Sequence, residues 1–136
     1  MENTKGAKGR RAKTGKTWQF VALPHFVLNA KSFINLSHPS IRLLLEVARQ
    51  YNGSNNGDLT IITKDLRSRG WKSNDVIQRA KNELLASGFI QETRKGARPN
   101  KASLYALTWQ PLNIMDKYEI SINSFKKNAF LDNKPP

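Results

Sequence analysis

The sequence contains no cysteine, so it can form neither a disulfide nor a thiolate metal site. No apolar run in it approaches the roughly 18 residues that a membrane-spanning helix needs. The basic N-terminus is not followed by the apolar segment of a secretory signal peptide. These absences favour a cytoplasmic protein that has no disulfide framework and no membrane partner.

Groups suited to acid–base or metal chemistry are also scarce. The two histidines, His25 and His38, each lie beside a proline, where a structural or solvated role is expected. The acidic residues occur singly, so neither a paired-carboxylate site nor a metal cluster is indicated. The segment "GAKGRRAKTGKT" ends in Gly-Lys-Thr but lacks the glycine spacing and preceding strand of a phosphate-binding loop. We therefore expect no enzyme and no cofactor.

Positive charge is what the chain has in excess. Its 23 Lys and Arg residues stand against 10 Asp and Glu, which gives a net charge of +13. Such a field attracts polyanions whatever the fold. Nucleic acid, an acidic protein and an anionic membrane surface are the candidate partners, and we favour nucleic acid. A length of 136 residues allows one domain with a tail or two.

Much of that charge lies in residues 1–17, which hold three glycines and, after Met1, no large apolar side chain. Such a segment buries too little surface to offset its chain entropy, so we predict a flexible basic arm. The arm either lies along phosphates or in a minor groove, or it only solubilises the protein. Its candidate DNA-binding residues are Lys8, Arg10, Arg11, Lys13 and Lys16.

The following segment, 17–37, is rich in aromatic and aliphatic residues and is expected to cover the core. Pro24 favours the first turn of a short helix through Leu28, and a second short helix is expected over Lys31–Leu36. A base-stacking platform would need aromatic residues exposed together. We instead expect all three tryptophans in the core or at its rim: Trp18, Trp71 and Trp109.

Two longer helices and a short one are predicted next. The first begins at a Ser37 cap and stops near Gly53. Its expected inward stripe is Ile41, Leu44, Leu45, Ala48 and Tyr51. A short strand, "LTII", precedes a short helix that Thr63 caps. The third helix starts at a Ser73 cap and ends before Gly88, after a turn of three or four residues. That is the spacing of a helix-turn-helix.

The third helix has two faces. One is an apolar stripe of Ile77, Ala80, Leu84 and Leu85. The other offers amides, a guanidinium and a carboxylate in place of the Glu and Lys usual on a solvated helix. In the DNA major groove these groups can pair with adenine, guanine and cytosine respectively. We predict base reading by Asn74, Asp75, Gln78, Arg79 and Asn82, with phosphate contacts from Lys72 and Ser73 at the helix start.

The carboxylates of this helix allow other interpretations. Asp75 could simply serve the helix N-terminus and pair with Arg79, four residues later. Glu83 is expected at the edge of the apolar stripe, paired near Lys81 or with a basic group on another helix. If Glu83 faced the groove, the proposed docking would be wrong.

Two strands, Ile90–Arg94 and Ala102–Trp109, are predicted around a loop that contains Gly, Pro and Asn. Glu92 is the one acid close to the cations of this loop. Like charges at a hairpin tip repel one another, so a counter-anion is expected, although an ordinary exposed hairpin is the alternative. The candidate DNA-binding residues here are Arg94, Lys95, Arg98, Asn100 and Lys101.

After Trp109 the pattern loses regular organisation. Tyr118, Ile120 and Ile122 alternate as in a short strand, while Phe125 and Phe130 are isolated in the sequence. The apolar residues of this extension either pack back on the core through Trp109 or join a second copy. The hypothesis is a weak homodimer that forms or tightens on DNA.

In this order of elements, residues 37–109 resemble the winged helix-turn-helix fold, an α+β and mainly α fold with a three-helix core and a β-hairpin wing. The match is closest at "SNDVIQRAKNELLASGFIQETRKG", through its Arg-Ala-x-x-x-Leu core and its "SGFI" lead into the hairpin. The preceding "LPHFVLNAKSFINLSHPSIRLLLEVA" is similar to the start of phage and plasmid replication proteins of the protein O type. The resemblance covers roughly residues 20–109.

This resemblance implies that the third helix enters the major groove and that the wing touches the flanking backbone or minor groove. It divides the chain into a basic arm, 1–17, a winged-helix domain, 18–109, and a C-terminal extension, 110–136. We expect a double-stranded DNA-binding protein that regulates transcription in a phage or mobile element. The alternatives are a replication-initiation or accessory protein and an adaptor that binds an acidic host or replication protein. RNA is less expected, because its A-form major groove admits side chains poorly.

Overall fold

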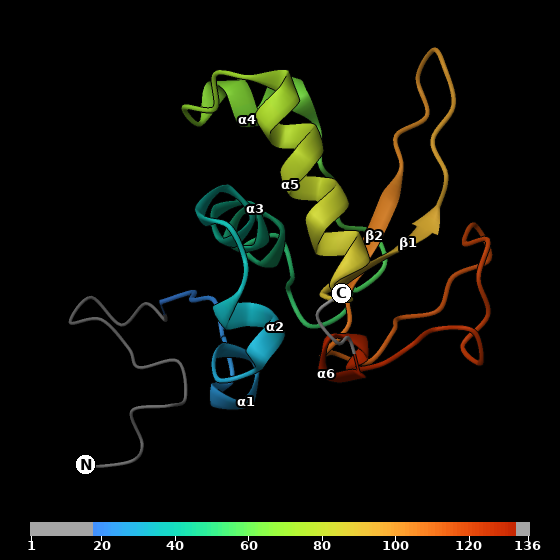
Figure 1. The fold of residues 1–136 in the computed structure, drawn as a ribbon. Coiled ribbons are helices and arrows are strands. Elements are labelled where there is room, and N and C mark those ends of the chain that lie inside the picture. The colour runs from blue at the N-terminus through green and yellow to red at the C-terminus, as the bar shows by residue number, and fades with distance from the viewer. Residues whose placement is uncertain (1–17, 133–136) are drawn as a thin grey trace.

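The structure is a computed structural model that describes residues 18–132. The predicted arm, 1–17, lies outside the described residues. Within them, six helices and one two-stranded antiparallel sheet follow one another along the chain (Figure 1). The α+β class with mainly helical content is confirmed. No helix among the described residues has the length and apolarity needed to cross a membrane.

Two single-turn helices come first, α1 (His25–Leu28) and α2 (Lys31–Ile34). Pro24 is the N-cap of α1 rather than a residue of its first turn. The second helix ends two residues earlier than predicted, since the chain leaves it at Asn35. Val27 of α1 is fully buried, so the helical part of the segment covers the core as expected, whereas Trp18 and Phe20 before it are exposed.

The helix α3 (His38–Ala48) begins at Ser37, whose hydroxyl accepts a hydrogen bond from the backbone N–H of Ser40 at 3.4 Å. Its predicted inward stripe was wrong in part, because Leu45 is 42% exposed. The stripe starts one residue earlier, at Ser40, where a polar residue is tolerated because its hydroxyl is hydrogen-bonded. The residues that α3 buries are Ser40, Leu43, Leu44, Glu46, Val47 and Ala48.

The helices α4 (Thr63–Ser68) and α5 (Asn74–Ala86) are joined by residues 69–73. Thr63 is the first helical residue of α4 and caps nothing, because Ile62 holds the N-cap position. At α5 the predicted cap is confirmed, since Ser73 Oγ accepts from the backbone N–H of Val76 at 3.2 Å. The apolar stripe of α5 packs on α3. Ile77, Ala80 and Leu84 are buried in it and Leu85 is half-buried.

The sheet consists of β1 (Ile90–Arg94), as predicted, and β2 (Leu104–Leu107), which is shorter than predicted. They pair antiparallel from Ile90↔Leu107 to Arg94↔Leu104 with one bulge. The predicted strand "LTII" was wrong, and only Leu59 forms a bridge, to Tyr105. The reason lies at Thr60. The Gln50 side chain accepts a hydrogen bond from the backbone N–H of Thr60 (2.9 Å) and donates one to the Thr60 carbonyl (2.8 Å). Neither backbone group of Thr60 therefore joins the sheet.

The C-terminal extension folds back on the chain. The predicted strand over Tyr118–Ile122 was wrong, since these residues form turns and bends. Tyr118 instead packs against Leu104, Ala106 and Leu112 on the outer side of the hairpin. The close approach needs Gly57, with φ of +124°, because a Cβ there would lie 2.5 Å from the Tyr118 ring.

The last helix, α6 (Ala129–Asp132), carries Phe130 into the core, where it is 1% exposed and stacks on Phe89 at a centroid distance of 4.8 Å. Phe130 is therefore isolated in the sequence but not in the fold. A Cβ on Gly88 would lie 2.7 Å from the backbone of Ala129, so this helix sits directly on the end of α5.

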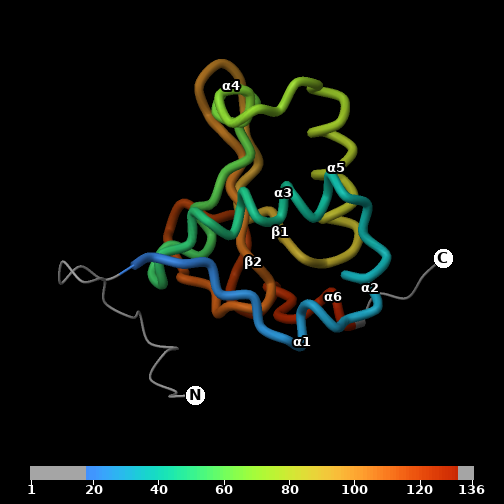
Figure 2. The backbone as a smooth tube through the Cα atoms, turned by 90° about the vertical axis from the view of Figure 1, so that its left-hand side faces the viewer, coloured from blue at the N-terminus to red at the C-terminus, as the bar shows by residue number. Residues whose placement is uncertain are grey.

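Figures 1 and 2, which view the molecule from two directions, show two groups of elements at its opposite ends. We call the first the polar end: it comprises α4, the first turns of α5 and the hairpin loop, residues 95–103. The second is the aromatic end, which comprises α1, α2 and α6. In Figure 1, α5 runs down from the polar end between α4 and the hairpin.

Candidate nucleic-acid interface

The predicted reading face of α5 lies on the surface, because the opposite stripe of the helix is held against α3. Ser73 is half-buried as the cap, and the other predicted residues are exposed: Lys72, Asn74, Asp75, Gln78, Arg79 and Asn82. The amphipathic pattern of this helix therefore placed its polar residues correctly.

These exposed residues differ in whether they have partners. The side chains of Lys72, Gln78 and Asn82 form no hydrogen bond or ion pair with any residue in the described part of the chain. The amide oxygen of Asn74 accepts two hydrogen bonds from the Arg67 guanidinium, at 2.7 and 3.2 Å. The free amides can therefore make new hydrogen bonds without breaking internal ones.

Arg79 and Asp75 form the predicted i,i+4 ion pair, with 3.1 Å between Nε and the carboxylate oxygen. Their side chains are 73% and 77% exposed. An ion pair so exposed to solvent contributes little to stability. It can open at small cost, so it leaves Arg79 available to a ligand.

Glu83 does not lie on this polar face. Its carboxylate accepts hydrogen bonds from the Ser37 backbone N–H at 3.3 Å, from the Ser37 hydroxyl at 2.7 Å and from the Ser40 hydroxyl. The predicted basic partner was wrong, and two serines at the start of α3 take its place. Burial raises the pKa of Glu83, but the serine hydrogen bonds lower it more, so the net shift is downward. The charged carboxylate thus ties α5 to α3.

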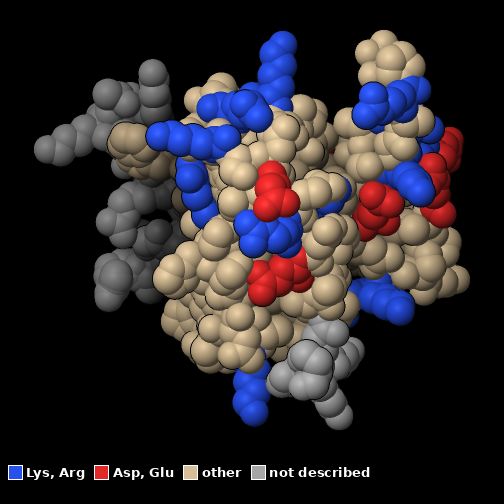
Figure 3. Space-filling view, turned by 45° about the horizontal axis from the view of Figure 1, so that its top comes forward, with Lys and Arg blue, Asp and Glu red and all other residues tan. Residues whose placement is uncertain are grey.

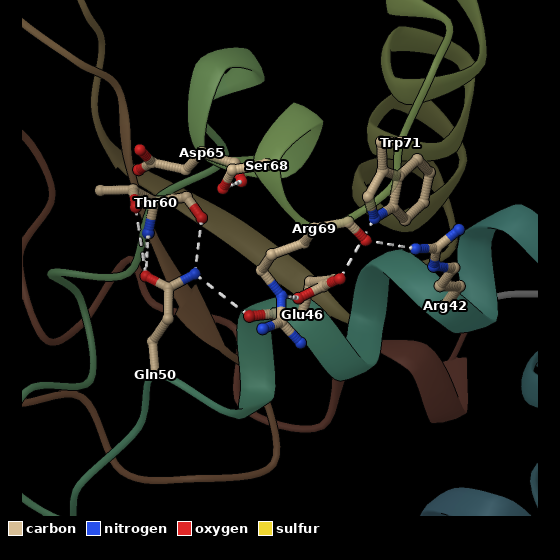
Figure 4. A network of polar contacts seen from close by, with 8 residues as sticks. All are labelled: Arg42, Glu46, Gln50, Thr60, Asp65, Ser68, Arg69 and Trp71. Atoms are coloured by element: carbon tan, nitrogen blue, oxygen red, sulfur yellow. Dashed lines mark hydrogen bonds and ion pairs between the residues drawn. The ribbon is translucent and has the colours of Figure 1, made fainter.

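A polar network around one buried carboxylate holds the turn before α5 (Figure 4). Glu46, 7% exposed, accepts hydrogen bonds from Arg69 Nε and, at 3.1 Å, from Trp71 Nε1. Arg42 lies over the Trp71 ring, 4.6 Å from its centroid, and donates to the Arg69 carbonyl at 2.8 Å. The network fixes residues 69–73, and with them the start of α5, on α3. Nothing in the local sequence pattern separates Glu46 from an ordinary surface glutamate.

Further basic residues, which the sequence pattern did not single out, lie beside α5. Lys64 and Arg67 on α4 are exposed, as is Arg42 on α3. The polar end therefore carries cations on α4 as well as on the hairpin loop, with α5 between them. Figure 3, which brings this end forward, shows Lys and Arg side chains at the upper left and upper right of the molecule. The signal was present in "KDLRSR", where three cations accompany one acid.

The hairpin loop presents most of its predicted residues to solvent: Lys95, Arg98, Asn100 and Lys101. Two backbone hydrogen bonds between Ala97 and Lys101, of 2.8 and 2.9 Å, close its tip. Arg98 and Lys101 have no ion-pair partner among residues 18–132. The tip therefore carries uncompensated positive charge.

Arg94 is the exception in this set. It is half-buried, and its guanidinium donates to the Ala102 carbonyl at 2.7 Å, across the hairpin. Its Nε is buried without a partner in the described structure. Arg94 thus braces the base of the loop, and its charge is less accessible than that of Arg98 or Lys101.

The described residues give little support to acid–base or metal chemistry. His25 and His38 are exposed, and the part of the chain that the structure describes contains no group of three or more His, Asp or Glu residues able to hold a metal. The five predicted arm residues lie outside the described range: Lys8, Arg10, Arg11, Lys13 and Lys16. Comparisons with protein-family models, curated proteins and solved structures found no match to this chain.

Proposed function

We propose that this chain is a winged helix-turn-helix protein that binds double-stranded DNA sequence-specifically. Three features of the fold support the proposal. The helices α3, α4 and α5 precede a β-hairpin, as in that architecture. The bridge from Leu59 to Tyr105 adds a third backbone segment beside β2. A short turn joins α4 to α5.

The observation that carries the proposal is the outer face of α5. The side chains of Gln78 and Asn82 have no partner in the described structure, Arg79 is held only by an exposed ion pair, and Glu83 is turned onto α3. Amides and a guanidinium are the groups that pair bidentately with adenine and guanine in the major groove. An α-helix also fits the width of that groove.

The neighbouring cations supply the second half of the interface. Exposed cations lie at the hairpin tip, Arg98 and Lys101, and on α4, Lys64 and Arg67. In the view of Figure 1 the hairpin and α4 lie on either side of α5. Contacts from such residues to phosphates position a reading helix without specifying sequence. The proposed roles are therefore base recognition by α5 and backbone contacts by the hairpin and α4.

Regulation of transcription in a phage or mobile element is the biological role that we propose. A replication-initiation role uses the same DNA surface and differs in the site bound. A footprint on the DNA around the chain's own gene separates the two. Protection over a promoter supports regulation, and protection over a repeated origin-like sequence supports replication.

We also propose a weak homodimer that forms or tightens on DNA. The described part of the extension keeps four large apolar side chains at the surface, Ile114 (53% exposed), Met115 (47%), Ile122 (62%) and Leu131 (53%). Stopping the chain after Gln110 would remove Phe130 from the core, so point variants give a cleaner test. Sedimentation with and without a duplex should show two copies on DNA, and Ile114→Ser with Ile122→Ser should leave one. Equal stoichiometry in both proteins would contradict the dimer.

The DNA-binding proposal is tested by titrating the full chain with duplexes of varied sequence at several salt concentrations. We expect affinity to fall steeply with salt and to differ among sequences. Weak duplex binding that is independent of DNA sequence and disappears at physiological salt would instead favour an adaptor for an acidic protein. Such an adaptor would have no need for the free amides of α5.

A further inference from the structure

Two aromatic side chains near the N-terminal end of the described chain are left in solvent. Trp18 is 65% exposed and Phe20 is 63% exposed, whereas Trp71 and Trp109 are each 5% exposed. The sequence-based expectation that every tryptophan lies in the core or at its rim was wrong for Trp18. Neither ring serves the core, so their exposure calls for another explanation.

The segment that carries them, at the blue start of the described chain in Figure 2, has no regular secondary structure. Residues 18–23 contain no helix, turn, bend or bridge, and they form no backbone hydrogen bond with another described residue. In extended backbone, side chains two residues apart point to the same side. When such a segment is extended, a rise of about 3.3 Å per residue brings side chains of this spacing about 6.6 Å apart, roughly twice the 3.4 Å rise per base along a DNA strand. One nucleic-acid base fits between two rings at that spacing.

A groove runs beside this segment, between it, the end of α3 and β2. Its lining includes Phe20, Tyr51 and Trp109, together with the amides and cation of Gln19, Asn52 and Arg49. Among the described residues that line it, none is acidic. None of them belongs to α5 or the hairpin loop, so the groove and the proposed duplex-binding face can be occupied together.

The charge of the adjoining sequence favours a polyanion as the occupant. Six Lys and Arg residues lie between positions 5 and 16, directly before Trp18. An apolar protein partner has no use for this concentration of charge in the sequence that precedes the rings. Stacked bases over a cationic track are the common solution for binding single strands.

We propose that Trp18 and Phe20, with the groove beside them, form a stacking site for single-stranded DNA. Binding there involves base–ring stacking, and Arg49 lies within reach of the strand's phosphates. This goes beyond the duplex recognition proposed for α5. A protein with both sites can hold a duplex and an unpaired strand beside it.

The test uses tryptophan fluorescence of the full chain. Trp18 is exposed and Trp109 lines the groove, whereas Trp71 is buried away from it, so quenching on titration with oligothymidylate reports on the proposed site. We expect saturable quenching, and Phe20→Leu should weaken strand binding roughly five-fold or more. Trp18→Leu should weaken binding by a similar factor in an assay with a labelled strand, and Trp18→Phe should restore most of it. Ile34→Ala, which changes a side chain 68% exposed on α2, is the matched control and should change nothing.

Several outcomes would overturn the proposal. One is the absence of saturable quenching at physiological salt. Another is an equal loss of single-strand and duplex binding in Trp18→Leu and Phe20→Leu, because the rings would then serve duplex DNA. If the variants abolish self-association but not strand binding, a second copy fills the groove. Stronger binding of oligouridylate than of oligothymidylate would identify RNA as the occupant. Gln78→Ala should leave strand binding unchanged, so this proposal can fail or hold independently of duplex recognition.

Discussion

The aromatic end and the polar end differ in what their side chains bind. At the aromatic end, Phe26, Phe89 and Trp109 surround Phe130, with centroid distances between 4.8 and 6.4 Å. At the polar end, the exposed amides and cations mostly lack internal partners within the described structure. Stability is therefore concentrated at the aromatic end, whereas the polar end, where duplex binding is proposed, is free to form contacts without supporting the fold. Substitutions should separate these two properties.

The largest effect is expected from Phe130→Ala at the aromatic end. The ring is 1% exposed, and its removal would leave a cavity among aromatic neighbours. We expect the free energy of unfolding to fall by about 3–5 kcal/mol. Leu131→Ala is the control, since Leu131 is adjacent in sequence and 53% exposed, and it should cost less than about 0.5 kcal/mol. Urea denaturation measures both. Equal losses would mean that α6 does not anchor the extension.

Gln78→Ala and Arg79→Ala should weaken DNA recognition and leave stability almost unchanged, the reverse of Phe130→Ala. Each should remove about 1–3 kcal/mol of discrimination between the best duplex and a scrambled one, because alanine cannot form the bidentate hydrogen bonds to a base. The free energy of unfolding should change by less than about 0.5 kcal/mol. Asn123→Ala, an exposed amide on the extension, is the control. Equal weakening on both duplexes would remove α5 from base reading.

A smaller effect is expected at the hairpin tip. Arg98→Ala and Lys101→Ala should weaken every duplex alike, and each should reduce the slope of log K against log salt by about 0.9 if its side chain neutralises one phosphate. Arg94→Ala should mainly lower stability, since Arg94 is bonded to Ala102 within the hairpin. Lys126→Ala, on the extension, serves as the charge control. An unchanged slope in both tip variants would place the hairpin away from DNA.

The smallest effect concerns the hydrogen bonds by which the Glu83 carboxylate on α5 holds the start of α3. The serine hydrogen bonds lower the pKa of Glu83 in the folded protein, so its contribution is complete above the unfolded carboxyl pKa of about 4.3. That contribution is lost as the pH falls through the lower folded pKa. Glu83→Gln should therefore show a shallower loss of stability below about pH 4.3 than the wild type. Denaturation midpoints across this range, with Asp116→Asn as control, measure it. If the wild type and Glu83→Gln lost stability equally as the pH falls, the Glu83 charge would have no role.

Local signals in the sequence predicted much of the fold. Ser37 and Ser73 cap their helices because a cap needs only a hydroxyl three residues before an N–H. The inward stripe of α5 followed from side-chain periodicity, and the bounds of β1 followed from the strand residues that precede a loop containing Gly, Pro and Asn. The exposed face of α5 followed from that stripe, because the residues opposite a buried stripe of a helix must face solvent.

Long-range contacts could not be predicted in the same way. Ser40 lies in the buried stripe of α3 because Glu83, far along the chain, accepts its hydrogen bond. Thr60 is kept out of the sheet by Gln50. The place of Phe130 in the core depends on Gly88 allowing α6 to approach. Each of these depends on partners that only the folded chain brings together.

Selection from a pool of random duplexes tests most directly whether α5 reads DNA sequence. The wild type is compared with the double variant Gln78→Ala, Asn82→Ala, whose side chains have no partner within the described structure and whose removal should leave the fold intact. We predict that the wild type enriches a defined motif and that the double variant loses preference at some of its positions while still binding unselected DNA. If the wild type enriches no motif, or if both proteins enrich the same motif equally, α5 is not a recognition helix.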